Sequence, residues 1–321
     1  MRISIPASNL SSFESRRSAC DRRGFAGDRG GRVQEDAALV SDVESDTSRS
    51  AAIDRVVEVA IGAATDAGTL LRERLTRPRD VQYKGTVDLV TDADRASETL
   101  IAGMIRETFP DHRILGEEGA RGAEPEREGA AGSPYGWLID PLDGTTNYAH
   151  GLPTFAVSIG LERTGTMEVG VVYDPMRDEL FVARRGQGAT CNGRPLHVSG
   201  TDALIGAILT TGFSYNLAER TGQAAIWGRF LGGVQAIRQT GSAALNLCYV
   251  AAGRIDGYWE RPLRPWDVAA GALIVSEAGG RIGHFRDQPF DPYGAEVVAS
   301  NGRLHEAMLA VIAGEATAAG S

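Results

Sequence analysis

Two carboxylates three positions apart make the segment WLIDPLDGTTNY, residues 137–148, the part of the chain best suited to chemistry. Asp140 follows an apolar run typical of a buried strand, and Pro141 is expected to end that strand. Asp140 and Asp143 should then lie at one strand-to-loop corner, where Gly144 permits a sharp turn. Adjacent unpaired carboxylates are costly, and a hard cation such as Mg²⁺ is the usual compensation because no His or Cys accompanies them.

The residues after this corner have the character of a helix start. Gly144, Thr145 and Thr146 are expected to form a first turn, whose free N–H groups and positive dipole end suit a phosphate. An Asp-Gly pair alone is usual in an ordinary turn, but the full string indicates metal and phosphate sites side by side. Haloacid dehalogenase-type phosphatases also place Asp residues after a strand, with D-x-D spacing. The D-x-x-D spacing here would misplace the second carboxylate, which disfavours a covalent aspartyl-phosphate route.

Two further acidic groups are weak signals when each is taken alone. Glu117 and Glu118 follow a short apolar pair, and Asp267 opens an apolar helical segment. A Glu-Glu pair usually lies on a solvated face, and an Asp near a helix start is usually a cap. They become site candidates because they occur in the same chain as the Asp140–Asp143 pair.

The elements that must position these residues alternate between helices and strands. Apolar residues at helical spacing predict a helix over residues 53–75. Thr91 followed by Asp94 predicts a capping box and a second helix that ends before Pro110. Closely spaced strands, expected to be antiparallel, are predicted at residues 137–140, 154–162, 167–174 and 179–183. Further helices are predicted at residues 217–231, 242–252, 267–278 and 303–314, which gives a mixed α/β class.

Residues 1–50 differ from the rest, because they lack apolar periodicity and change from an Arg-rich to an acidic stretch. Such a segment buries too little apolar surface to offset its ordering entropy. We therefore expect a disordered extension, or a start codon assigned upstream of the true one. An organellar transit peptide is the alternative, weakened by acidic residues in the segment. The predicted catalytic domain is residues 51–321, with a half to about residue 200 that carries most metal ligands. The half over about residues 201–315 carries the substrate pocket and Asp267.

Composition narrows the function classes. The formal net charge of −9 argues against nucleic acid as the main ligand, since phosphate-backbone binding needs a Lys/Arg surplus. The three cysteines form no C-x-x-C pair, which indicates neither zinc nor a disulfide framework and favours a cytoplasmic location. No apolar run approaches the about 20 residues that span a bilayer, so we expect no membrane partner.

Taken together, five segments resemble the inositol monophosphatase family in order and spacing. They are VDLVTDAD (87–94), ILGEEG (114–119), IDPLDGTTNYAHGLP (139–153), QTGSAALN (239–246) and RPWDVAAGALIVSEAGG (264–280). The resemblance covers the chain from Ile53 onward. It implies a five-layer α-β-α-β-α sandwich, a homodimer, two to three Mg²⁺ ions per subunit and sensitivity to Li⁺.

The resemblance also implies roles, position by position. Glu117, Asp140 and the carbonyl of Leu142 would bind a first metal, and Asp140, Asp143 and Asp267 a second, with Glu117 helping to hold a third. Thr145 and Asp94 would orient and help deprotonate a metal-bound water that attacks phosphorus in line. The N–H groups of Gly144 and Thr145 would hold phosphate oxygens, with Asp143 also near the substrate. Three more residues would lie along the alcohol: Ser242, Ala243 and Glu260. Lys84 matches a family lysine, but its segment KGTVD is one residue short. Arg264 is a candidate for another reason: it lies three residues before Asp267, so it is expected to face the substrate or a subunit partner.

The function implied is hydrolysis of myo-inositol monophosphate, a small phosphorylated polyol. Relatives with the same metal site hydrolyse fructose 1,6-bisphosphate, histidinol phosphate, NADP or 3′-phosphoadenosine phosphates, and the pocket walls that choose between them are not readable from sequence. A hypothesis from another class is a regulatory interaction protein, whose only support is the basic stretch near residues 16–23.

Overall fold

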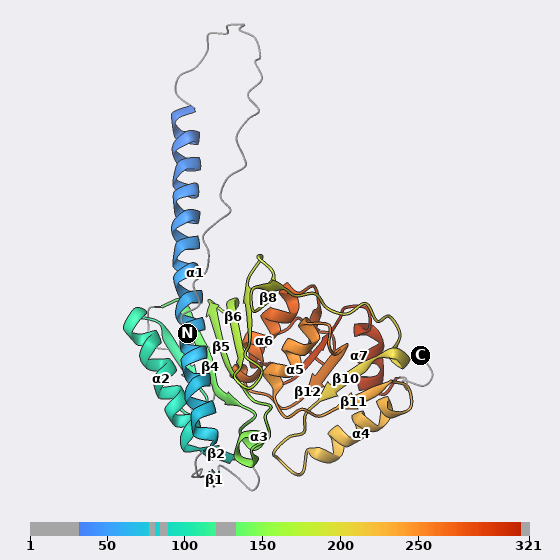
Figure 1. Cartoon of the computed structure of the whole chain (residues 1–321). Helices are drawn as coiled ribbons and strands as arrows, with labels where there is room; N and C mark the ends of the chain where they lie inside the picture. The colour runs from blue at the N-terminus through green and yellow to red at the C-terminus, as the bar shows by residue number, and fades with distance from the viewer. Residues whose placement is uncertain (1–31, 77–80, 84–88, 120–132, 316–321) are drawn as a thin grey trace, which may run out of the picture. The chain divides into compact units, whose positions relative to one another are not determined.

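A computed structural model of the chain describes residues 32–76, 81–83, 89–119 and 133–315 (Figure 1). The chain divides into residues 1–50 and residues 51–321, and the fold described here is that of the second unit. The helices are α1 (Arg32–Leu75), α2 (Asp92–Thr108), α3 (Thr145–His150), α4 (Arg220–Leu231), α5 (Ala243–Ala251), α6 (Pro265–Glu277) and α7 (His305–Ala313).

Fourteen strands are assigned in the described ranges, and they form three sheets. The strands are β1 (Val81–Tyr83), β2 (Leu89–Thr91), β3 (Arg113–Gly116), β4 (Tyr135–Asp143), β5 (Ala156–Arg163), β6 (Thr166–Asp174), β7 (Glu179–Arg184), β8 (Ala189–Cys191), β9 (Arg194–Pro195), β10 (Ile208–Thr211), β11 (Ala236–Arg238), β12 (Gly257–Glu260), β13 (Arg281–Gly283) and β14 (Val297–Ser300). The seven-stranded sheet has the order β3-β4-β5-β6-β7-β8-β9, and the five-stranded sheet has the order β11-β10-β12-β14-β13. From β4 to β9 each neighbouring pair is antiparallel, as predicted.

Three hydrophobic cores separate the layers of residues 51–321. One core joins α1 and α2 to the seven-stranded sheet, a second surrounds α5 and α6, and a third joins the five-stranded sheet to α4 and α7. Helices α5 and α6 lie between the two sheets (Figure 1). Every residue of α5 is buried, because a helix covered on both sides needs apolar residues all round rather than along one stripe. The predicted α-β-α-β-α sandwich is thereby confirmed.

Local sequence signals set most element ends. Helix α2 begins with the predicted capping box, since Thr91 accepts from the Ala93 N–H and the Asp94 carboxylate accepts from the Thr91 N–H. Helix α1 ends as predicted but begins at Arg32, upstream of the expected start at Ile53. Disorder was predicted for residues 1–50, of which residues 1–31 lie outside the described residues and residues 32–50 belong to α1. The domain division stays a prediction. Within the described ranges, no helix is long and apolar enough to cross a membrane.

Candidate active site

The predicted carboxylate corner lies at the end of β4, but Pro141 does not end that strand. Strand β4 continues to Asp143, and its register with β5 shifts between Asp140 and Asp143. A bulge tolerates a proline because the irregular position needs no ladder N–H, so the expected break is instead an irregularity inside the strand. Both carboxylates are buried, with relative exposures of 3% and 8%, and the Leu142 N–H donates to Asp140 Oδ1 at 3.0 Å.

Helix α3 starts immediately after this corner, as predicted. Gly144 has φ of 93°, and a Cβ at this position would lie 3.0 Å from the Thr154 carbonyl oxygen, so the turn requires glycine. Thr145 Oγ1 donates to Asp94 Oδ1 at 2.9 Å. Thr91 donates to the other oxygen of Asp94 from its N–H at 2.8 Å and its hydroxyl at 2.6 Å. Burial raises the pKa of Asp94, and these hydrogen bonds oppose the rise.

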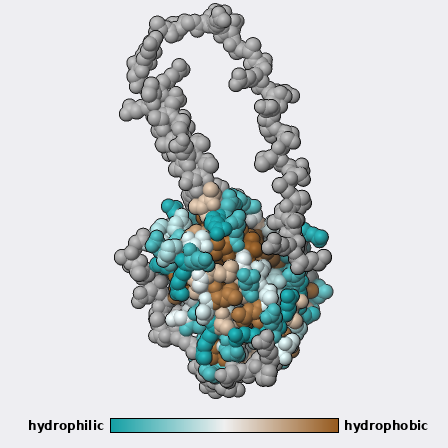
Figure 2. Space-filling model, turned by 60° about the vertical axis from the view of Figure 1, so that its left-hand side comes forward, coloured by the Kyte–Doolittle hydropathy of each residue, from teal (hydrophilic) through white to brown (hydrophobic). Residues whose placement is uncertain are grey.

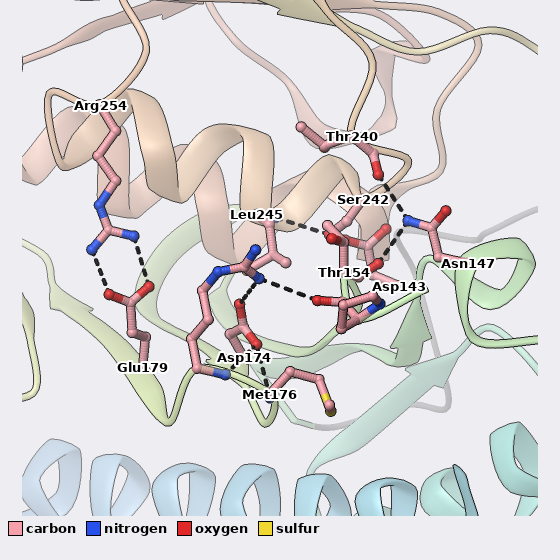
Figure 3. A network of polar contacts seen from close by, with 12 residues as sticks. Asp143, Asn147, Thr154, Asp174, Met176, Glu179, Thr240, Ser242, Leu245 and Arg254 are labelled. Carbon is pink, nitrogen blue, oxygen red and sulfur yellow. Dashed lines mark hydrogen bonds and ion pairs between the residues drawn. The ribbon is translucent and has the colours of Figure 1, made fainter. Parts of the chain in front are cut away.

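Asp143 contacts the first turn of α5, a pairing that sequence reasoning missed. Its carboxylate accepts from the Ser242 hydroxyl (Figure 3). It also accepts from the Ala243 N–H at 3.1 Å and from the Ala244 N–H at 2.8 Å. Burial raises the pKa of Asp143 to about 6, and the Ser242 hydrogen bond opposes the rise. Ser242 and Ala243, predicted to contact the alcohol, therefore donate to Asp143 here. Their predicted role toward substrate is not tested by this geometry.

Asp267 and Glu260 come from the other half of the chain. Asp267 is in the first turn of α6, where its carboxylate accepts from the Arg264 N–H at 2.7 Å. Glu260 ends β12 and accepts from the Tyr258 hydroxyl at 2.6 Å. Burial raises the pKa of Glu260 to about 7, and the Tyr258 hydrogen bond opposes that rise. A Cβ at Gly212 would collide with the Glu260 carboxyl group, so this glycine makes room for it.

One cavity of about 1200 Å³ brings most of the predicted site together. The predicted residues that line it are Glu117, Asp140, Leu142, Asp143, Gly144, Thr145, Ser242, Ala243, Glu260, Arg264 and Asp267. Asp94 is not among the lining residues and contacts the cavity through Thr145. Lys84 lies outside the described residues.

The electrostatics of the cavity match the ligand chemistry of a hard cation. Burial, and then the neighbouring Glu117, raise the pKa values of both Asp140 and Asp267 well above normal. Among the described residues, no ion pair with Lys or Arg neutralises Asp140, Asp143 or Asp267. Buried carboxylates that repel one another fit Mg²⁺, which prefers oxygen ligands.

The described carboxylates that line the cavity are not arranged as a ready set of metal ligands. Within the described ranges, no three His, Cys, Asp or Glu side chains stand at the spacing of a ready ligand set. Three of the acids instead accept from nearby protein donors: Asp140 from Leu142, Asp143 from α5, and Asp267 from Arg264. The carboxylates thus share a cavity and an electrostatic field, and their assignment as metal ligands stays a prediction.

Two of the residues that line the cavity, Asn147 and Tyr215, were not among the predicted site residues. Asn147, inside the TTN string, donates to the carbonyl oxygens of Thr154 and Thr240, each at 2.7 Å, and so ties α3 to the segment before α5 (Figure 3). Tyr215 lies with its hydroxyl 3.2 Å from Thr146 Oγ1. Asn147 could have been found from its motif, whereas Tyr215 lies in an irregular loop with no pattern.

The chain is similar in sequence to proteins of one known family. The inositol monophosphatase family matches residues 52–317. The chain is 45% identical over 258 residues to the Nus factor SuhB of Escherichia coli K12, covering 79% of this chain and 94% of that protein. It is 42% identical over 259 residues to an inositol-1-monophosphatase of Synechocystis, covering 80% of this chain and 88% of that protein.

A solved structure extends the likeness to three dimensions. The inositol monophosphatase of Anabaena superposes with a TM-score of 0.72 at 41% identity, covering 82% of this chain and 96% of that one. The family match, over residues 52–317, spans the five- and seven-stranded sheets and the residues that line the cavity. The chain therefore belongs to the inositol monophosphatase family.

Proposed function

We propose that this phosphatase of the inositol monophosphatase family is a Mg²⁺-dependent phosphomonoesterase that hydrolyses myo-inositol monophosphate to inositol and phosphate. The observation that carries the proposal is that the four proposed acidic ligands line one cavity although they come from three parts of the fold, together with the Thr145–Asp94 hydrogen bond. Acidic walls alone would repel a phosphate ester, so a cation is needed between them and the substrate.

The proposed ligands of Mg²⁺ are Glu117, Asp140, the Leu142 carbonyl, Asp143 and Asp267. Bound there, Mg²⁺ would neutralise charge on the phosphate and make water a stronger nucleophile. The chain's own residues do the rest. The Thr145 hydroxyl donates a hydrogen bond to Asp94 Oδ1, so the pair is placed to orient a water and accept its proton, with Glu117 assisting.

Substrate positioning falls to groups at both ends of the cavity. The N–H groups of Gly144 and Thr145 are proposed to hold phosphate oxygens. Tyr258 holds Oε2 of Glu260 by a hydrogen bond. The other carboxylate oxygen, Oε1, is proposed to accept from a substrate hydroxyl. Ser242 and Ala243 complete the alcohol side, and Arg264, which lines the cavity, is proposed to face the substrate.

A substrate panel with Mg²⁺ tests the choice of ester. Release of phosphate from myo-inositol 1-phosphate is compared with release from fructose 1,6-bisphosphate, histidinol phosphate, NADP and 3′-phosphoadenosine phosphate. We expect inositol phosphate to have the highest kcat/KM, and preference for another ester would replace this substrate with that one. The name of the Synechocystis relative supports the first choice.

A matched pair of variants tests the metal-site assignment. Asp140→Asn should abolish the Mg²⁺-dependent activity, because it removes the carboxylate proposed to bind two ions. Asp92→Asn changes an exposed carboxylate that pairs with Arg74 at 2.7 Å, and it should leave turnover unchanged. Li⁺ should inhibit the native chain. Full activity of Asp140→Asn would refute the metal-site assignment.

The second candidate function is regulatory interaction, since the Escherichia coli relative is named Nus factor. A purified chain inactive on every ester of the panel would favour this function over catalysis. The low Lys/Arg content relative to Asp/Glu still disfavours nucleic acid as the main ligand. A cytoplasmic location is part of the proposal.

We also propose a homodimer. Apolar side chains gather on one face of the molecule among hydrophilic ones (Figure 2). Half-buried apolar side chains also occur on α1 and β7, namely Val57, Ile61, Leu180 and Val182. Such surfaces are typical of subunit contacts. Sedimentation of the full chain at several concentrations measures the mass directly, and a monomer throughout would contradict this part of the proposal.

A further inference from the structure

A second cavity, of about 570 Å³, lies between α4, the end of α7 and the loop after β13. Among its walls are three arginines, Arg229, Arg261 and Arg286, and one carboxylate, Glu296. It shares no lining residue with the cavity that holds the acidic cluster. In a chain with a net charge of −9, this concentration of positive charge calls for an explanation.

The arginines are not neutralised by the described part of the chain. No ion pair joins any of the three to a carboxylate there. Glu296 already accepts from the Phe285 N–H at 3.0 Å, and Asp287 pairs with Arg281 at 2.7 Å. Three guanidinium groups and one carboxylate around the cavity leave a net positive charge, which is a binding arrangement for an oxyanion.

The hydrogen-bond donors of Arg229 are only partly used. One of its amino groups donates to the Ile312 carbonyl oxygen at 3.0 Å, which caps the end of α7. Its Nε atom is buried and has no hydrogen-bond partner among the described residues.

The cavity also has an apolar side. The guanidinium of Arg261 lies over the Phe285 ring, 5.3 Å from its centroid, and Ile226 and Ile312 line the same space. The volume exceeds what one inorganic oxyanion fills and lies in the range of small-molecule sites, about 300–1000 Å³. The walls therefore fit an anion that carries an organic group.

We infer that this cavity is a second ligand site, separate from the acidic cavity, for a small organic phosphate held by Arg229, Arg261 and Arg286. The site is linked to the wall of the acidic cavity through Gln223. The buried Gln223 side chain accepts from the Ser214 N–H at 2.8 Å and donates to the Arg261 carbonyl oxygen. Ser214 lines the acidic cavity, so a ligand that moves Arg261 also acts on the loop at Ser214.

The test uses phenylphosphonate, a phosphate-like dianion with an aromatic group that a phosphatase cannot hydrolyse. It is titrated by calorimetry into the full chain without added divalent metal, where the acidic cavity repels anions. We expect one saturable site, and binding should weaken at least about tenfold in Arg286→Glu, because one charge-assisted contact becomes a repulsion. Arg106→Glu makes the same charge change at an exposed position on α2 and should bind as the native chain does.

Two further arms separate the possible outcomes. Sulfate should bind more weakly than phenylphosphonate, and equal affinity would overturn the organic part of the inference. Asp140→Asn should leave the affinity unchanged, whereas a large change would place the ligand in the acidic cavity and overturn the inference. No binding, or equal binding by Arg286→Glu, would also overturn it.

Hydrogen exchange measures the proposed link. Phenylphosphonate should slow amide exchange in residues 213–223 of the native chain and not in Arg286→Glu, and unchanged exchange in the native chain would refute the link. The outcome is independent of the proposed phosphatase activity, because Arg286→Glu should turn over inositol phosphate normally.

Discussion

The hydrogen bond from Tyr258 to Glu260 gives the sharpest test of the proposed substrate contacts. Tyr258 is fully buried, and its hydroxyl lies 2.6 Å from Glu260 Oε2. The hydroxyl donates to the carboxylate, so it favours the ionised form and lowers a pKa that burial raises to about 7. In Tyr258→Phe, water cannot reach the buried position to replace the donor, and the pKa of Glu260 should rise further.

The size of the shift follows from the strength of such a bond. A hydrogen bond to a charged group contributes about 1.5–3 kcal/mol, and one pKa unit corresponds to about 1.4 kcal/mol. The pKa of Glu260 should therefore rise by about one to two units. About half of the Glu260 side chains are ionised at pH 7 in the native chain, and about a tenth would be after a one-unit rise. KM for inositol phosphate should then increase about fivefold at neutral pH, with a smaller effect on kcat.

The assay is kcat/KM for myo-inositol 1-phosphate between about pH 6 and pH 9, where the acidic limb reports groups that must be ionised in the free enzyme. Tyr258→Phe should move that limb to higher pH by about one unit or more. Tyr135→Phe, which changes a half-buried tyrosine stacked on His112, should leave it in place. Glu260→Gln should remove the contribution near pH 7, and the limb that remains should no longer respond to Tyr258→Phe. A limb that does not move in Tyr258→Phe, or that still moves when Tyr258→Phe is added to Glu260→Gln, would refute the reasoning.

Three other predictions concern single sites. Burial lowers the pKa of His305 to about 4, so the contribution of neutral His305 to stability is complete above about pH 6.5 and is lost as the pH falls toward about 4. In urea unfolding, His305→Gln should reduce the loss of unfolding free energy over this pH range by about 2 kcal/mol. Thr145→Ala should lower kcat by about 10²–10⁴ while Thr145→Ser retains most activity, because only serine keeps the hydroxyl on Asp94, and equal loss in both would contradict that role. A Cβ at Gly170 would lie 2.6 Å from the Ala270 carbonyl oxygen, so Gly170→Ala should lower the free energy of unfolding by about 1–3 kcal/mol. Gly103→Ala meets no atom within 4 Å inside α2 and should raise that free energy by up to about 1 kcal/mol, and a loss as large as at Gly170 would exclude backbone crowding as the cause.

Local sequence signals predicted much of the fold because they act over a few residues. The Thr91–Asp94 capping box and the start of α3 at Thr145 were predicted and are present. The prediction that Pro141 ends a strand was wrong, because the bulge between β4 and β5 absorbs the missing N–H and depends on the partner strand. The start of α1 was missed because the residues before Ile53 carry no apolar periodicity.

The sequence by itself determined which residue types are available for chemistry: the paired carboxylates of the D-P-L-D string, the glycine needed at φ of 93°, and the family to which the chain belongs. Only the tertiary structure decided which groups meet. Asp143 lies against the α5 N-terminus, Gly212 makes room for Glu260, and Arg229 and Arg261 line one cavity although they come from separate elements. These contacts depend on how two sheets pack on α5 and α6. Such packing is set by burial summed over the whole domain, and no short segment encodes it.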